Sequence, residues 1–273
     1  MWEDYQALIA RDLSEISLEY LFVDAVFEAL RRHGAKEALL VAWCIDSDGR
    51  KHLLHLAVGN KESEACWTGF FRSMLERSLR MPTTATSDGA PGLIRAIEVC
   101  FPASIRIRCW FHRLANIRAK LPDESAPEVM AHLYAVRDAP TLDAARAAAD
   151  RLVNTYGRNY PAAIACFQDD LDALLAIHRV PARHRIRVRT TNLAERSFVE
   201  ERRRTKVIPR LMDERAAMKL VFATMIRAAQ RWCRVSINDL ERHQLKLLRA
   251  ELGLDPPPAA DERKTHRRKN IAA

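Results

Sequence analysis

The order of strand-like and helix-like segments between residues 19 and 111 most constrains how this chain can fold. Three apolar, β-prone segments come first, at residues 19–30, 37–45 and 51–58. The turn between the second and third contains Asp48-Gly49, a strong hairpin signal. Helices are then predicted at 62–79 and 91–100, and strands at 83–87 and 105–111. A hairpin followed by alternating strands and helices predicts an α/β fold, a mixed sheet flanked by helices.

This order of segments is similar to that of ribonuclease-H-like cores, in which the first strand lies between the hairpin and the fourth strand. Asp24 belongs to the first strand-like segment, and Asp88 directly follows the fourth. We therefore expect these two side chains to lie side by side.

The remaining sequence divides by composition. Residues 1–18 are an amphipathic lead-in segment, and residues 19–121 form the first part of the core. Residues 122–181, rich in Ala, Leu and Arg, predict an all-helical insertion, and residues 182–250 predict C-terminal helices that complete the core, among them 192–205 and 213–234. Residues 251–273 form a basic tail with three consecutive prolines, which predicts disorder.

The positive charge of the chain is concentrated in residues 183–210 and in the C-terminal tail, residues 261–270. The net charge is +9, and residues 183–210 alone hold ten Lys or Arg against three Glu. Such a surplus favours a polyanionic partner, and counterion release would make that binding salt-dependent. The alternative is a solvated basic face paired with Glu200 and Glu201. We expect DNA contacts from a group of basic side chains: Arg187, Arg189, Arg196, Arg202, Arg203, Arg204 and Lys206.

The cysteine pattern and hydropathy indicate a cellular location. Six cysteines are scattered without a Cys-x-x-Cys pair, and the N-terminus shows no secretory signal. No apolar run approaches the ~20 residues that span a bilayer. We expect a cytoplasmic, nucleoid-associated protein with free thiols and no membrane contact.

Asp24, Asp88 and Glu195 are the candidate metal-binding acids. Mg²⁺ prefers carboxylate oxygens, and two such ions can neutralise a phosphate and activate a water. Each acid also has a structural interpretation. Asp24 could lie on a solvated edge, Asp88 could belong to a turn, and Glu195 could close a capping box with Asn192.

Several motifs together resemble the Mutator-type transposases of bacterial insertion sequences. The resemblance runs from about residue 11 to 230 and is carried by four stretches: Tyr20-Leu21-Phe22-Val23-Asp24, Ser87-Asp88-Gly89-Ala90-Pro91-Gly92-Leu93, Arg108-Cys109-Trp110-Phe111-His112-Arg113 and Thr190-Thr191-Asn192-Leu193-Ala194-Glu195-Arg196. It implies a DDE core in which Asp24, Asp88 and Glu195 bind Mg²⁺ or Mn²⁺, two ions in all. It further implies cleavage at transposon ends, joining to target DNA, and a homo-oligomer.

Two departures from the family pattern affect these expectations. Phe27 stands where relatives commonly carry Tyr, and the chain starts almost directly before the first acid-bearing strand. We therefore expect a truncated transposase that lacks most of its end-binding region. Alternatives are a catalytically inactive DNA-binding remnant, a regulator of a full-length transposase, or a nuclease that uses the same site for hydrolysis.

Cys109, His112 and Asn192 are candidates for supporting the site. Cys109-x-x-His112 has the spacing of two zinc ligands, but a structural zinc site needs four, and no second pair with suitable spacing follows. We favour a structural role near the acids over metal ligation.

Overall fold

The computed structural model describes residues 1–28, 37–59, 63–205, 214–230 and 232–255. Its five strands are β1 Leu18–Glu28, β2 Glu37–Asp46, β3 Lys51–Gly59, β4 Thr84–Ser87 and β5 Ile105–Arg108. They form one mixed sheet in the order β3-β2-β1-β4-β5. The β1–β2 and β2–β3 pairs are antiparallel, whereas β1–β4 and β4–β5 are parallel. The expectation that the first strand is central is therefore confirmed.

Strand β1 is buried on both faces, which explains its continuous apolar sequence. Tyr20 and Phe22 belong to the core on one face of the sheet, and Leu21 and Val23 belong to the core on the other. Because side chains alternate along a strand, Asp24 lies on the same face as Tyr20 and Phe22. This places the acid on one defined side of the sheet.

Two helices cover the Leu21 face. They are α2 (Glu64–Leu75), whose N-cap Ser63 accepts a hydrogen bond from the Cys66 N–H, and α3 (Pro91–Cys100), which has Pro91 at its first turn. Trp67, Phe71 and Leu93 are buried against the strands there.

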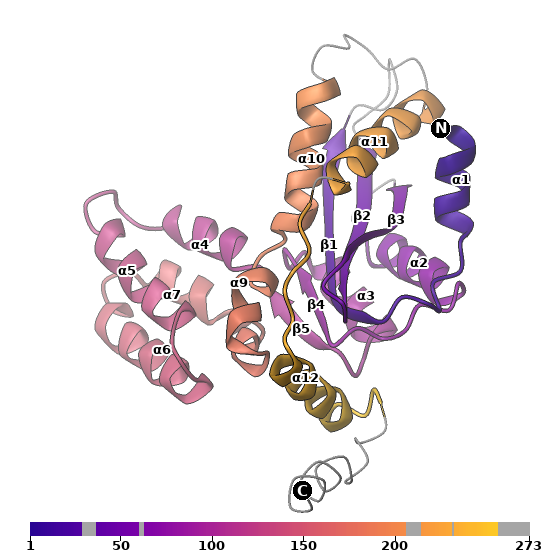
Figure 1. Ribbon diagram of the computed structural model, residues 1–273. Helices are drawn as coiled ribbons and strands as arrows, with labels where there is room; N and C mark the ends of the chain where they lie inside the picture. The colour runs from indigo at the N-terminus through magenta and orange to yellow at the C-terminus, as the bar shows by residue number, and fades with distance from the viewer. Residues whose placement is uncertain (29–36, 60–62, 206–213, 231, 256–273) are drawn as a thin grey trace, which may run out of the picture.

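The Tyr20 face is covered by helices from both ends of the chain: α1 (Trp2–Ala10), α10 (Asn192–Thr205) and α11 (Glu214–Ala229). Figure 1 shows α10 and α11 lying in front of β1, β2 and β3. Ala194 and Phe198 of α10 are buried in this core, and the Ser197 hydroxyl accepts a hydrogen bond from the Trp43 indole at 3.2 Å. These contacts fix the rotation of α10 on the sheet.

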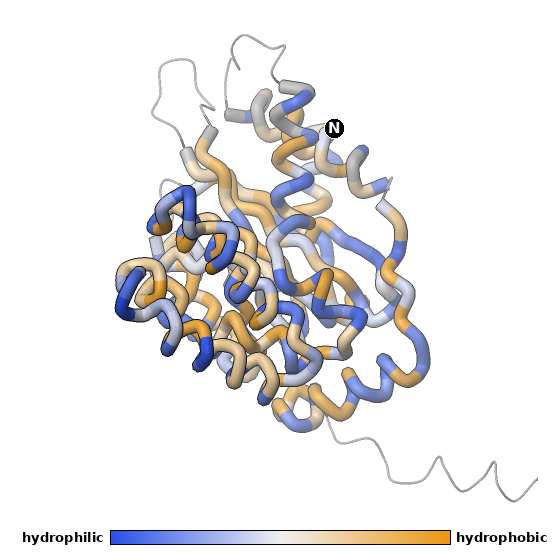
Figure 2. Tube along the Cα trace, turned by 90° about the vertical axis from the view of Figure 1, so that its left-hand side faces the viewer, coloured by the Kyte–Doolittle hydropathy of each residue, from blue (hydrophilic) through white to orange (hydrophobic). Residues whose placement is uncertain are grey.

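A helical lobe stands beside the sheet, between β5 and α10 in the chain (Figure 1). Its elements are α4 Trp110–Arg118, α5 Ala126–Arg137, α6 Leu142–Tyr156, α7 Pro161–Gln168, α8 Leu171–Leu175 and the 3₁₀ turn η1 Ala176–Arg179. Figure 2 shows the alternation of polar and apolar positions along these helices. The described elements from α5 to η1 are all helical. That they form an insertion with the bounds 122–181 stays a prediction.

Charged side chains join the lobe to the sheet and hold the lobe together. The Arg106 guanidinium on β5 pairs with the Asp170 carboxylate before α8, which joins sheet and lobe. Within the lobe, Arg113 on α4 donates to the Cys166 carbonyl at 2.5 Å and to the Asp169 carboxylate at 3.0 Å. Since Arg113 is buried, these bonds satisfy a group that would otherwise be costly to bury.

The last described segment returns to the start of the sheet. The Val235 N–H bonds the Gly49 carbonyl in the β2–β3 turn, and α12 (Asp239–Glu251) starts with an Asn238–Glu241 capping box. Arg249 on α12 donates to the Leu18 carbonyl at 3.1 Å. None of the described helices is long and apolar enough to cross a membrane.

Two local predictions are wrong. The predicted 105–111 strand ends at Arg108, and α4 begins at Trp110, because the Trp110 N–H and indole are bonded to Arg189 O and Leu174 O. The arginine-rich stretch before α10 forms the short turns η2 (Ala182–His184) and α9 (Arg185–Val188). Residues 251–255 are ordered by the Arg249–Asp255 ion pair, whereas 256–273 lie outside the described residues.

Candidate active site

The register of two parallel strands brings Asp24 and Asp88 to the same level. Tyr20 pairs with Thr84, and Phe22 pairs with Thr86. Two residues further along, the same register sets Asp24 beside Asp88, where β4 has just ended. The Asp88 carboxylate accepts the Ala90 N–H at 3.0 Å, which holds the turn after the strand. Neighbouring parallel strands thus supply two acids at one point of the sheet.

Glu195 approaches this point from helix α10. Its carboxylate accepts the Thr191 hydroxyl at 2.7 Å, and its side chain is 24% exposed. Helix α10 begins at Asn192 itself, so Asn192 does not occupy the cap position that the alternative interpretation required. Asn192 is exposed. A capping box between Asn192 and Glu195 is therefore not the arrangement found.

The segment that precedes α10 is tied to the acid-bearing strands. The Thr86 hydroxyl donates to the Val188 carbonyl at 2.8 Å, and the Trp110 N–H donates to the Arg189 carbonyl at 2.9 Å. The Thr191 N–H donates to the Cys109 sulfur at 3.4 Å. These bonds bring the start of α10, and with it Glu195, to the ends of β4 and β5.

The electrostatics of Asp24 reflect crowding of like charges. The side chain is 6% exposed, and its pKa is raised to about 7, first by burial and then by the Asp88 carboxylate, with a smaller contribution from Glu195. Positive charge on His112 acts in the opposite direction. The three acids are therefore within electrostatic reach of one another, and Asp24 is costly to ionise without a neutralising cation.

His112 and Cys109 lie beside the acids. The His112 Nε2 is 3.9 Å from the Glu195 Oε1. The pKa of His112 is raised to about 9, chiefly by the neighbouring Cys109 sulfur and further by the Asp24 and Glu195 carboxylates. His112 is thus a cation at neutral pH and partly offsets the carboxylates. Both residues have the expected position near the acids.

Glu195 is shared by two possible groups of metal ligands, one with Cys109 and His112 and one with the two aspartates. Among the described residues, the ligand atoms of Cys109, His112 and Glu195 all lie within 4.8 Å of one another. Three donors do not complete a structural zinc site, and the Cys109 sulfur already accepts from Thr191. The carboxylates of Asp24, Asp88 and Glu195 are hard oxygen donors that fit Mg²⁺ or Mn²⁺.

The predicted DNA-binding arginines take different positions. Arg203 lies 3.9 Å from Glu200, as the alternative of a face paired with Glu200 and Glu201 expects. Arg189 is paired with a different acid, Asp138 of the helical lobe, at 2.7 Å. Arg187 and Arg196 are exposed and border the same cavities. Arg202 and Arg204 lie on α10, but the structure does not describe their side chains, and Lys206 lies outside the described residues.

Other residues near the acids were not foreseen from the sequence. Lys51 on β3 and Trp232 after α11 border a cavity together with Arg187 and Arg196. Phe111 and Tyr134 from the helical lobe border a neighbouring cavity. No local motif joins these residues, because they come together only through the packing of α4, α5 and α10.

The known proteins that this chain resembles are transposases, and the similarity extends over almost the whole chain. A family model described as "Transposase, Mutator family" matches residues 1–235. The transposase for insertion sequence element IS6120 of Mycolicibacterium smegmatis is 34% identical over 280 residues, which cover 99% of this chain and 87% of that protein. The transposase for ISRM5 of Rhizobium meliloti is 28% identical over 90% of this chain and 63% of its own length. The transposase for IST2 of Acidithiobacillus ferrooxidans is 33% identical over 71% of this chain and 66% of its own length.

Proposed function

The chain belongs to the Mutator family of transposases, and on this premise we propose that it is a DDE transposase with a ribonuclease-H-like core. Its reaction is metal-dependent cleavage of DNA at transposon ends followed by joining of the freed 3′ hydroxyl to target DNA. Asp24, Asp88 and Glu195 carry this reaction.

One observation supports the proposal above the others. Asp24 on β1 and Asp88 directly after the parallel neighbour β4 lie at the same level, and Glu195 on α10 is within electrostatic reach of Asp24. The raised pKa of Asp24, caused by burial and by the other two acids, supports the proposal, because cations would offset the charge of these clustered carboxylates.

The three carboxylates would hold the divalent cations. When bound, such cations neutralise the phosphate and lower the pKa of a coordinated water or hydroxyl. The Thr191 hydroxyl orients Glu195 through its 2.7 Å hydrogen bond. His112, a cation at neutral pH, lies 3.9 Å from Glu195 and reduces the repulsion among the acids before cations arrive. Exposed Arg187 and Arg196 are available to position flanking phosphates.

The partner of this site is DNA, both transposon ends and target. Because two ends are handled together in transposition, we expect a homo-oligomer. Size-exclusion chromatography with light scattering, with and without DNA, measures the assembly directly.

The test of the proposal compares the protein with an Asp88→Asn variant. Both are incubated with nicked or branched DNA and Mg²⁺ or Mn²⁺, and products are resolved on a denaturing gel. Asn keeps the oxygen that accepts the Ala90 N–H, so the turn should persist while the charge is lost. We expect metal-dependent cleavage or joining by the protein and a loss of at least about 100-fold in the variant.

The matched control is Asp143→Asn, an exposed acid in the first turn of α6. It should cleave like the unmodified protein. Equal DNA binding by all three proteins with no product from any of them would contradict the proposal and favour an inactive DNA-binding protein. Cleavage without any joining would instead indicate a nuclease.

A further inference from the structure

A groove between the helical lobe and α10 exposes aromatic side chains. It has a volume of about 560 Å³, within the usual range of ligand sites, and it is bordered by α4, α5 and the stretch from Ile186 to Arg196. Phe111, Tyr134 and Ile186 are 55%, 42% and 58% exposed. We call this cavity the lobe groove. Large apolar side chains left this exposed around one cavity indicate a binding surface.

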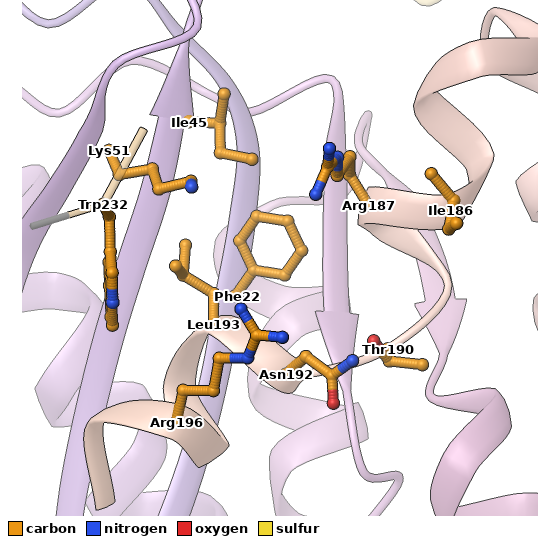
Figure 3. Close-up of a pocket in the computed structure, with 10 residues that line it drawn as sticks. All are labelled: Phe22, Ile45, Lys51, Ile186, Arg187, Thr190, Asn192, Leu193, Arg196 and Trp232. Carbon is orange, nitrogen blue, oxygen red and sulfur yellow. The ribbon is translucent and has the colours of Figure 1, made fainter. Parts of the chain in front are cut away.

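A second, smaller cavity continues from the lobe groove. It measures about 100 Å³ and shares Ile186, Arg187, Thr190, Asn192 and Arg196 with its neighbour. Figure 3 shows Lys51, Arg187 and Arg196 around Phe22, with Trp232 at the side of the cavity. We call it the basic pocket.

The basic pocket carries uncompensated positive charge. No acid is present among the described residues that line either cavity. The pKa of Lys51 is lowered, first by burial and then by Arg187 and more weakly Arg196, although the Cys233 thiol nearby partly offsets this. Asp138 pairs with Arg137 and Arg189, and within the described parts of the chain no ion pair engages Arg187 or Arg196. An anion would therefore be stabilised here.

Both cavities lie next to the acid cluster. The rings of Phe111 and His112 are in edge contact, with centroids 5.6 Å apart, and His112 lies 3.9 Å from Glu195. On α10, Asn192 and Arg196 border the cavities on either side of Glu195 in sequence. The lobe groove is thus linked to Glu195 both through Phe111 and His112 and along α10.

We propose that the lobe groove holds an unstacked base of the DNA strand bound at the acids, while Lys51, Arg187 and Arg196 hold a phosphate of the same strand. The inference rests on the proposed function and adds to it the form of the substrate. A base inside a duplex cannot present its face to Phe111 or Tyr134, so only single-stranded or extruded nucleotides can use the groove. Aromatic rings beside a basic track are the arrangement that binds single strands without sequence preference.

The exposed Tyr134 ring already makes a contact of the kind a base would make. The Arg137 guanidinium lies over this ring, 4.6 Å from its centroid. A planar cation and an aromatic ring can both stack on a nucleobase. The surplus of cations disfavours an apolar protein segment as the occupant, since such a segment would leave the basic pocket unneutralised.

The experiment measures binding without divalent cations, in an Asp88→Asn background that does not depend on cleavage. Fluorescence anisotropy gives the affinity for a labelled oligothymidylate single strand and for a blunt duplex. The combined substitution Phe111→Leu and Tyr134→Leu keeps apolar volume but removes both rings. We expect about tenfold or greater loss of single-strand affinity with little change for the duplex.

A second pair of variants separates the two cavities. The double substitution Arg187→Gln and Arg196→Gln should weaken binding of both DNAs. It should also make the affinity depend less steeply on salt concentration, because fewer phosphate contacts release fewer counterions. Tyr134→Phe keeps the ring and should bind single strands normally. Leu247→Ala, an exposed apolar residue on α12, is the matched control and should change nothing.

The outcomes are distinct. Unchanged single-strand affinity in the ring-less variant would overturn the inference, and so would an equal loss for single strand and duplex. Ring-dependent single-strand binding in a protein that yields no metal-dependent product would preserve the groove and contradict the proposed reaction instead.

Discussion

Arg108 lies so close to Gly89 that a β-carbon at position 89 would fall 0.8 Å from the Arg108 Nη1. Gly89 has φ of +85°, a left-handed conformation that other residues adopt at a cost. It follows Asp88 directly, and the Asp88 carboxylate bonds the next N–H, that of Ala90. Arg108 is buried, and its pKa is lowered, chiefly by burial, so a new β-carbon would force this buried guanidinium to shift.

Gly89→Ala should therefore destabilise the protein by about 1–2 kcal/mol and misplace Asp88. Chemical denaturation measures the free energy of unfolding. The matched control is Gly69→Ala in α2, where a new β-carbon meets no atom within 4 Å. That change should stabilise the protein by about 0.5–1 kcal/mol, because alanine favours a helix over glycine. Equal effects of the two changes would contradict the role given to Gly89.

Asp24→Asn should raise the stability of the metal-free protein while abolishing cleavage. The pKa of Asp24 is raised to about 7 by burial and by Asp88, so ionising it above that pH opposes folding. Asn keeps the acceptor for the Ala25 N–H, which lies 2.9 Å from the present carboxylate, and removes the charge. We expect a gain of about 1 kcal/mol or more at pH ~8 in the presence of a chelator, measured by urea denaturation. A loss of stability would show that the charge is compensated.

Divalent cations should stabilise the protein through the same acids. A ligand that binds only the folded state at 100 times its dissociation constant adds about 2.7 kcal/mol. Mg²⁺ or Mn²⁺ should therefore raise the melting temperature by several degrees, as followed by circular dichroism. The shift should vanish in Asp24→Asn and persist in Asp143→Asn. A shift that survives in both variants would place the cations elsewhere.

The protein should lose stability on acidification partly through His55. His55, on β3, is buried against Phe70 of α2, with the ring centroids 4.7 Å apart. Burial lowers the pKa of His55 to about 4. Between its unfolded pKa of about 6.5 and about 4 the unfolded chain binds a proton that the folded chain does not, so stability falls as the pH falls through this window. His55→Leu should flatten the profile of unfolding free energy against pH in that range. An unchanged slope would show that His55 is protonated without cost.

The Arg106–Asp170 pair should contribute to holding the helical lobe against the sheet. Both side chains are largely buried, and the pKa of Arg106 is raised, first by its hydrogen bond to Asp170. Arg106→Gln should cost about 1–3 kcal/mol, since it leaves a largely buried carboxylate without its cation. Arg95→Gln, which breaks an exposed pair with Glu98, should cost less than about 1 kcal/mol. Limited proteolysis would show whether the lobe loosens first.

The central position of β1 was predictable because hairpin signals and apolar alternation are local. The position of Asp24 beside Asp88 was predictable from that topology together with the motifs that contain them. The helical start at Trp110 was not predictable, because it depends on bonds to Leu174 and Arg189, far along the chain.

The groove was not predictable for a similar reason. Phe111 lies in a motif that says nothing of its exposure, Tyr134 and Lys51 belong to no motif, and periodicity alone places aromatic residues in a core. Only packing of the lobe against α10 reveals that Phe111 and Tyr134 stay exposed. The turns η2 and α9 were not predictable either, because they depend on tertiary bonds. Arg185, for example, donates to the Pro140 carbonyl.

The separation of Glu195 from the strands that carry the other two acids has a consequence for synthesis. All five strands are complete by Arg108, so the sheet, with both aspartates in place, can begin to form while the ribosome is still translating the lobe. Glu195 emerges only after the whole lobe, and joining it to β1 closes a long loop, which is slow. The acid cluster is therefore assembled late, and a nascent chain that stops within the lobe carries a sheet without the third carboxylate.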